Sequence, residues 1–154
     1  MRRPQILVTI ALSCLATAEQ ASATPDQIVA QFVDSCIGSL PDFARIAETF
    51  QGTGFERTGE GQWLRDADGA VFMVRDAGDR LVCMAGLTGD YTEAFSASIE
   101  DRLANSQIGR VEKKQLAGRT LYLLQAPLGL TLLEVIPPMA ATTFIVANAQ
   151  KAAH

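Results

Sequence analysis

The chain has 154 residues, of which 48% are hydrophobic and 19% charged, which fits one folded domain and excludes a disordered or collagen-like chain. The formal net charge is −4, and no basic stretch of the kind that binds nucleic acid is present in the sequence. The one histidine is His154, which excludes Ser-His-Asp, Cys-His and histidine-ligated metal chemistry unless the terminus itself takes part.

Residues 1–23 have the pattern of a secretory signal peptide. Two arginines precede a short apolar run at residues 6–15, and small residues allow cleavage after Ala23. The apolar run is well short of the ~20 residues that span a bilayer. We therefore expect a periplasmic or secreted protein with a single domain over residues 24–154 and no transmembrane segment after cleavage. The alternative is a lipoprotein whose lipid is carried by Cys14.

Two cysteines, Cys36 and Cys83, remain after cleavage. A pair of cysteines in an exported chain usually forms a disulfide, and we predict a structural bridge here. In the chain-entropy model, closing a loop of this length contributes about 4 kcal/mol to stability. The alternative, a redox-active pair, lacks both the C-x-x-C spacing and a neighbouring cation that would lower a thiol pKa.

Capping residues and apolar periodicity predict three helices, beginning at Thr24, Ser39 and Asp90. Short apolar runs separated by turn residues predict strands. The expected strands are residues 63–65, 71–75, 81–85, 110–116, 120–125, 131–136 and 142–147. This order predicts an α+β fold, in which an antiparallel sheet of hairpins, or meander, has about three helices packed on one face and one disulfide.

Two of the expected strands carry apolar residues on both faces. The positions concerned are Leu121, Leu123, Leu132, Leu133, Val135 and Ile136. A sheet with one face in water alternates apolar and polar residues, so these strands are either covered on both sides within the monomer or meet a partner. We identify them as a candidate partner surface, for a homodimer or for another envelope protein.

Trp63, the single tryptophan, stands at the start of a predicted strand next to glycines. An aromatic ring there could be a ligand platform, and the alternative is ordinary packing within the sheet. No further residue pattern indicates a cofactor.

Metal and acid-base sites have weak support in the sequence. The turn Asp66-Ala67-Asp68-Gly69 resembles part of a calcium loop, but the flanking ligand positions are not acidic, so we interpret it as a turn. Met73, Met84 and Met139 are interpreted as core residues, not copper ligands. Carboxylate pairs such as Glu100 and Asp101 fall on exposed helix faces or turns, where no raised pKa is expected.

The leading hypothesis is a small exported protein that acts by binding a protein partner or a small ligand, without catalysis. A carboxylate-based hydrolase, with a site near Trp63 assembled only in three dimensions, is the first alternative. The second is a structural accessory subunit of an envelope complex. Acidic groups that converge in a cleft would favour the hydrolase, and a flat apolar sheet face would favour the binding protein.

Overall fold

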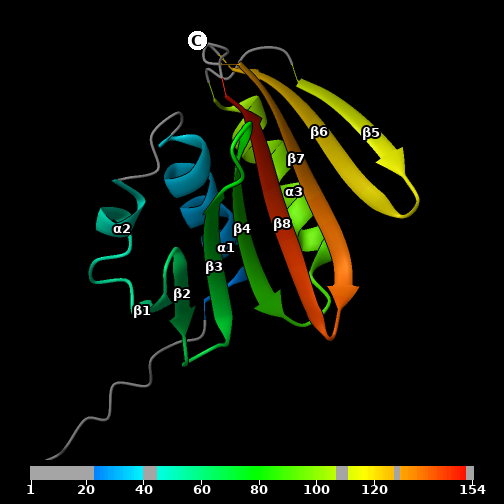
Figure 1. Cartoon of the computed structure of the whole chain (residues 1–154). Coiled ribbons are helices and arrows are strands. Elements are labelled where there is room, and N and C mark those ends of the chain that lie inside the picture. Colours follow the sequence, from blue (N-terminus) through cyan, green and yellow to red (C-terminus); the bar gives the residue numbers. More distant parts are fainter. Residues whose placement is uncertain (1–22, 40–44, 107–110, 127–128, 152–154) are drawn as a thin grey trace, which may run out of the picture.

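The computed structural model describes residues 23–39, 45–106, 111–126 and 129–151. The predicted leader, apart from Ala23, and the alternative lipid site at Cys14 lie outside the described residues. Across the described ranges the chain forms one eight-stranded antiparallel sheet accompanied by short helices (Figure 1). No helix in these ranges has the length and apolar character needed to cross a membrane.

The sheet consists of two four-stranded meanders that meet at its centre. Its strands are β1 (Glu56–Gly59), β2 (Gln62–Arg65), β3 (Ala70–Asp76), β4 (Arg80–Thr88), β5 (Val111–Leu116), β6 (Arg119–Ala126), β7 (Gly129–Met139) and β8 (Thr142–Gln150). The spatial order β1-β2-β3-β4-β8-β7-β6-β5 places the last strands of the two meanders, β4 and β8, side by side. The expected antiparallel sheet of hairpins is confirmed.

The first helix, α1 (Pro25–Phe32), begins where its sequence predicts. Thr24 Oγ1 accepts a hydrogen bond from the backbone N–H of Gln27 at 3.3 Å, and Gln27 Oε1 accepts one from the backbone N–H of Thr24 at 2.9 Å. This reciprocal pair is a capping box, and Pro25 occupies the first helical position, where no donor is lost. The helix continues as a π-helical segment, η1 (Val33–Ile37).

Helices contribute less to the fold than we expected. α1 and α3 (Thr92–Ala104) contact each other and lie across one face of the sheet, behind its central strands in Figure 1. By contrast, α2 (Ile46–Thr49) has four residues and contacts η1. It ends before Gly52 and Gly54, both of which have positive φ. The expectation of three helices packed on one face is therefore not confirmed, and the sheet dominates.

The hydrophobic core lies between the two longer helices and the sheet face that they cover. Strand side chains alternate between the two faces, so every second strand residue points into this core. Its largest fully buried side chains include Ile28, Phe32, Phe72, Phe95, Ile99, Tyr122, Leu124, Leu133, Val135 and Ile145.

A disulfide between Cys36 and Cys83 joins η1 to β4, as the sequence predicts. The two Cα atoms are 5.9 Å apart, and both residues are buried in the core. The bridge fixes the end of the first helical segment to a central strand. Its position in the core gives it a structural role.

Candidate functional site

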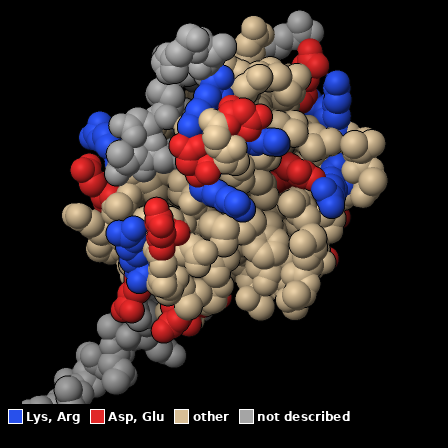
Figure 2. Space-filling model, viewed as in Figure 1, with Lys and Arg blue, Asp and Glu red and all other residues tan. Residues whose placement is uncertain are grey.

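The helices leave the opposite face of the sheet without a helical cover, as far as the described residues extend. On that side, half-buried side chains from four adjacent central strands form a continuous surface, which we call the open face. It consists of Val82, Met84, Phe144, Val146, Asn148, Leu132, Glu134, Ile136, Leu121 and Leu123. Figure 2 views this side and shows a broad area without charged residues over its lower half.

The backbone register places the open-face side chains in rows across the strands. Met84 of β4 lies opposite Val146 of β8, which lies opposite Glu134 of β7. On the side of β3, Met73 continues the same row. Cross-strand neighbours on one face are about 4.5–5.5 Å apart at Cβ, close enough for direct contact. The surface is therefore continuous from β3 to β6, and in this row only Glu134 of β7 interrupts its apolar side chains.

The candidate partner surface divides between the two faces. Four of its members, Leu121, Leu123, Leu132 and Ile136, belong to the open face. Leu133 and Val135 point the other way, and each is 0% exposed in the core. These two residues cannot contact a partner, and assigning them to that surface was wrong, because neighbours in a strand face opposite sides.

Sequence reasoning missed the part of the open face that lies on β4 and β8. Val82 and Met84 alternate with buried Leu81, Cys83 and Ala85, so that successive residues are apolar on both faces. The same pattern in β8 brings Phe144 and Val146 to the open side. The signal that identified the other two strands is present here as well. Met73 and Met84 lie on or beside this face and Met139 is 56% exposed, which corrects their interpretation as core residues.

One ion pair lies within the open face. Arg119 Nη1 donates a hydrogen bond of 2.9 Å to Oε1 of Glu134. The Glu134 side chain is only 14% exposed, whereas that of Arg119 is 49% exposed at the edge of the surface. The carboxylate is neutralised by its own neighbour, so a partner that covers the face does not bury an unpaired charge.

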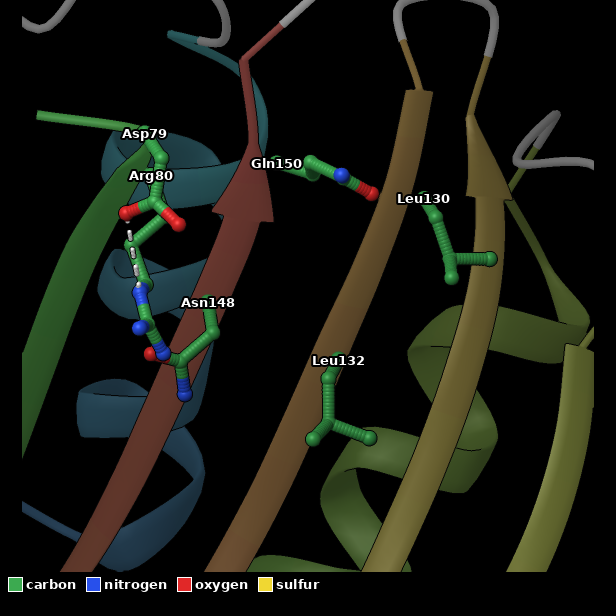
Figure 3. Close-up of a pocket in the computed structure, with 6 residues that line it drawn as sticks. All are labelled: Asp79, Arg80, Leu130, Leu132, Asn148 and Gln150. Atoms are coloured by element: carbon green, nitrogen blue, oxygen red, sulfur yellow. Dashed lines mark hydrogen bonds and ion pairs between the residues drawn. The ribbon is translucent and has the colours of Figure 1, made fainter.

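A hollow of about 300 Å³ lies at one end of the open face (Figure 3). Its lining residues are Asp79, Arg80, Leu130, Leu132, Asn148 and Gln150. Arg80 Nε donates to Asp79 Oδ1 at 3.3 Å, and the two leucines face the charged and amide groups across the hollow. This end of the face therefore combines apolar contact with hydrogen-bonding groups.

Trp63 belongs to an aromatic cluster on the covered side of the sheet. Its ring centroid is 5.0 Å from that of Phe50, and the residue is 9% exposed. Phe50 in turn contacts Phe55 and Phe72. The position matches the packing alternative, because the ring is enclosed by other side chains and offers little surface to a ligand.

Asp68 is held by several donors, of which Arg65 is the closest at 2.8 Å. Burial acts to raise the pKa of the Asp68 carboxyl, but hydrogen bonds from Arg65 and from the backbone N–H groups of Ala23 and Ala70 lower it below the ordinary value of 3.8. These contacts connect the start of α1 to the β2–β3 turn. The carboxylate therefore has a structural role.

Glu100 also has a lowered pKa, because it accepts hydrogen bonds from Lys113 at 2.6 Å and from the Tyr122 hydroxyl at 2.9 Å. The pKa of Asp26 is lowered by hydrogen bonds from Ser98 and Arg102, and that of Asp76 by Lys151. A general acid needs a raised pKa at neutral pH. Each of these carboxyl groups is shifted in the opposite direction.

In the described part of the chain, no group of three or more His, Cys, Asp or Glu residues is arranged to hold a metal ion. Comparison with known protein families, with curated proteins and with solved structures found no match to this chain. The open face is therefore the feature on which a functional proposal can be built.

Proposed function

We propose that this is an exported protein that acts by binding another protein through the open face. The observation that supports the proposal is the apolar surface of adjacent central strands on the side opposite the helices. Contiguous apolar area is rare on the surface of a protein without a partner, because its exposure to water is unfavourable by roughly 25 cal/mol per Å². The open face should therefore bind a protein that has an apolar surface of its own.

Export is supported by the buried disulfide, because such bridges persist in oxidising compartments. The pattern of residues 1–23 supports it independently. A binding role in the periplasm or outside the cell is therefore part of the proposal.

The hydrolase alternative has less support. It requires a carboxyl group kept protonated near neutral pH beside a cleft at Trp63. Trp63 is packed against Phe50, and the carboxyl groups with shifted pKa are shifted downward. The second alternative, a structural accessory subunit of an envelope complex, would use the same open face. It is therefore a special case of the binding proposal.

Site-specific photo-cross-linking in the cells that produce the protein tests this proposal. A photoreactive residue at position 146 lies in the centre of the open face, and one at position 94 lies on the exposed side of α3. We expect irradiation to join a protein to position 146 and not to position 94. Equal cross-linking at both positions, or none at 146, would contradict the proposal.

A further inference from the structure

We infer that the occupant of the open face is a second copy of this chain, packed sheet against sheet about a two-fold axis parallel to the strands. The inference rests on the proposed function, since it names the partner for that surface. It is argued from the shape of the sheet, its area and the arrangement of polar groups along its rows.

Shape favours a second copy. β-Sheets have a right-handed twist, so a broad sheet has the form of a saddle. Rotation by half a turn about an axis that lies along the central strands converts such a saddle into a parallel surface. Two copies can then stack at the roughly 10 Å separation of packed sheets, with complementary twist across the whole contact.

The area is sufficient for a stable dimer. The apolar rows extend over β3, β4, β8, β7 and β6. Five strands about 4.8 Å apart, each contributing about 25 Å of length, cover roughly 600 Å² of each copy. Two copies treated as flat surfaces therefore bury on the order of 1,200 Å² of surface in total, which is within the range of specific interfaces.

Opposite charges lie at the two ends of one row that crosses the open face. The row runs Arg75, Val82, Asn148, Leu132, Leu123 and Glu112, with each residue opposite the next across neighbouring strands. The proposed axis passes through the middle of this row, between β8 and β7. It sets Arg75 of each copy above Glu112 of the other and pairs Val82 with Leu123. The oppositely charged pairs then lie at the two edges of the contact, and three apolar residues and Asn148 lie between them.

Asn148 lies next to the proposed axis. Among the described residues, its side-chain amide has no hydrogen-bond partner, although Val82 and Leu132 flank it. An amide both donates and accepts, so two Asn148 side chains that meet across the axis can satisfy each other. A purely apolar cover would leave this amide unpaired, at a cost of about 1–3 kcal/mol.

The test measures the oligomeric state of the purified disulfide-bonded protein by light scattering and native mass spectrometry. We expect a dimer to form between about 1 and 100 µM, the range for an interface of this size without strong hot spots. Val82→Glu should raise the dimer dissociation constant by at least about 100-fold, because the proposed axis places this position against Leu123 of the other copy. The new glutamate lies opposite Arg75 of its own chain, so the variant keeps a favourable contact within that chain.

Two further variants make the test specific. Ala94→Glu, on the exposed first turn of α3 where an acidic residue is favourable, should leave the dimer unchanged. Arg75→Glu should weaken the dimer, and combining it with Glu112→Arg should restore it. Failure of this restoration would overturn the proposed axis.

A wild-type chain that stays monomeric at about 100 µM would overturn the inference, as would dimers of Val82→Glu that are as stable as those of wild type. The proposed function would survive if position 146 still cross-linked to a different protein in cells. If position 146 cross-linked to nothing and the chain stayed monomeric, both would fail. Circular dichroism of each variant confirms that it is folded, and Met84→Gln provides a milder substitution on the same strand.

Discussion

Leu132 and Leu133 are consecutive residues of β7 in opposite environments. Leu133 is 0% exposed in the core, whereas Leu132 is half-buried on the open face and lies opposite Asn148. Leu133 therefore stabilises the fold of the single chain, whereas Leu132 is available for contact with a partner.

Replacing each leucine with alanine should give unequal effects on stability. Leu133→Ala should lower the free energy of unfolding by about 2–5 kcal/mol, because it removes fully packed atoms and leaves a cavity. Leu132→Ala should cost about 1 kcal/mol or less in dilute solution, because its side chain is partly solvated in the single chain. Urea unfolding followed by circular dichroism measures both values. Equal losses would show that a single chain covers both faces.

The Cys36–Cys83 disulfide should contribute strongly to stability. It joins positions 47 residues apart in the sequence and lies in the core. Full reduction should lower the free energy of unfolding by about 4 kcal/mol, the value that loop closure gives for this length. Urea midpoints with and without reductant measure the change, and intact mass confirms that both thiols are free. An unchanged midpoint after confirmed reduction would contradict a structural role.

Asp68 should make stability depend on acid pH. Its pKa is below the ordinary value of 3.8 in the folded protein, so its contribution is complete above that value. The contribution is lost as the pH falls through the lowered, folded-state pKa. Asp68→Asn should cost about 2–3 kcal/mol at pH 7, since the Asp68 and Arg65 side chains are 4% and 16% exposed.

The control for Asp68→Asn is its pH profile. The variant should lose less stability than wild type between pH 7 and the acid range, because it has one fewer carboxylate whose pKa is lowered by folding. Thermal unfolding across that range measures the difference. If the stability of the two proteins changed in the same way with pH, Asp68 would not contribute to the pH dependence of stability.

The Tyr122 hydroxyl connects β6 to α3 through hydrogen bonds to Glu100 and to the backbone carbonyl of Ser96, of 2.9 and 3.3 Å. Burial and the hydrogen bond to the Glu100 carboxylate raise the pKa of Tyr122 above its usual range, so the hydroxyl keeps its proton and remains a donor at neutral pH. Tyr122→Phe should lower the free energy of unfolding by about 0.5–1.5 kcal/mol. Chemical denaturation measures this, and a neutral result would show that water replaces the lost contact.

Local signals in the sequence predict much of the fold. The capping box at Thr24 and the successive hairpins follow from short-range patterns, and the pairing of Cys36 with Cys83 follows from the number of cysteines. The strand β1 was not predicted, because Glu56–Gly59 contains no apolar residue. It forms because it pairs with β2, and such pairing is a tertiary effect that local patterns do not show.

The candidate site could be predicted only in part. Apolar residues at successive positions of Leu121–Leu124 indicate that both faces need cover, but they do not indicate which face the helices take. That choice fixes Leu133 and Val135 in the core and Leu132 outside it. The strand order also brings β4 beside β8, and β8 beside β7. The apolar residues of β4 and β8 therefore extend the surface that β6 and β7 form.

Methionine oxidation of the unmodified protein tests most directly whether the open face is covered in its native setting. Met73 and Met84 lie opposite each other on that side of the sheet, and Met139 is 56% exposed at the end of β7. Mild peroxide is applied to the gently prepared native fraction and to the purified protein at high dilution. We predict that Met73 and Met84 are protected only in the native fraction, while Met139 reacts equally in both. Equal oxidation of Met84 in the two samples would contradict a binding role for the open face.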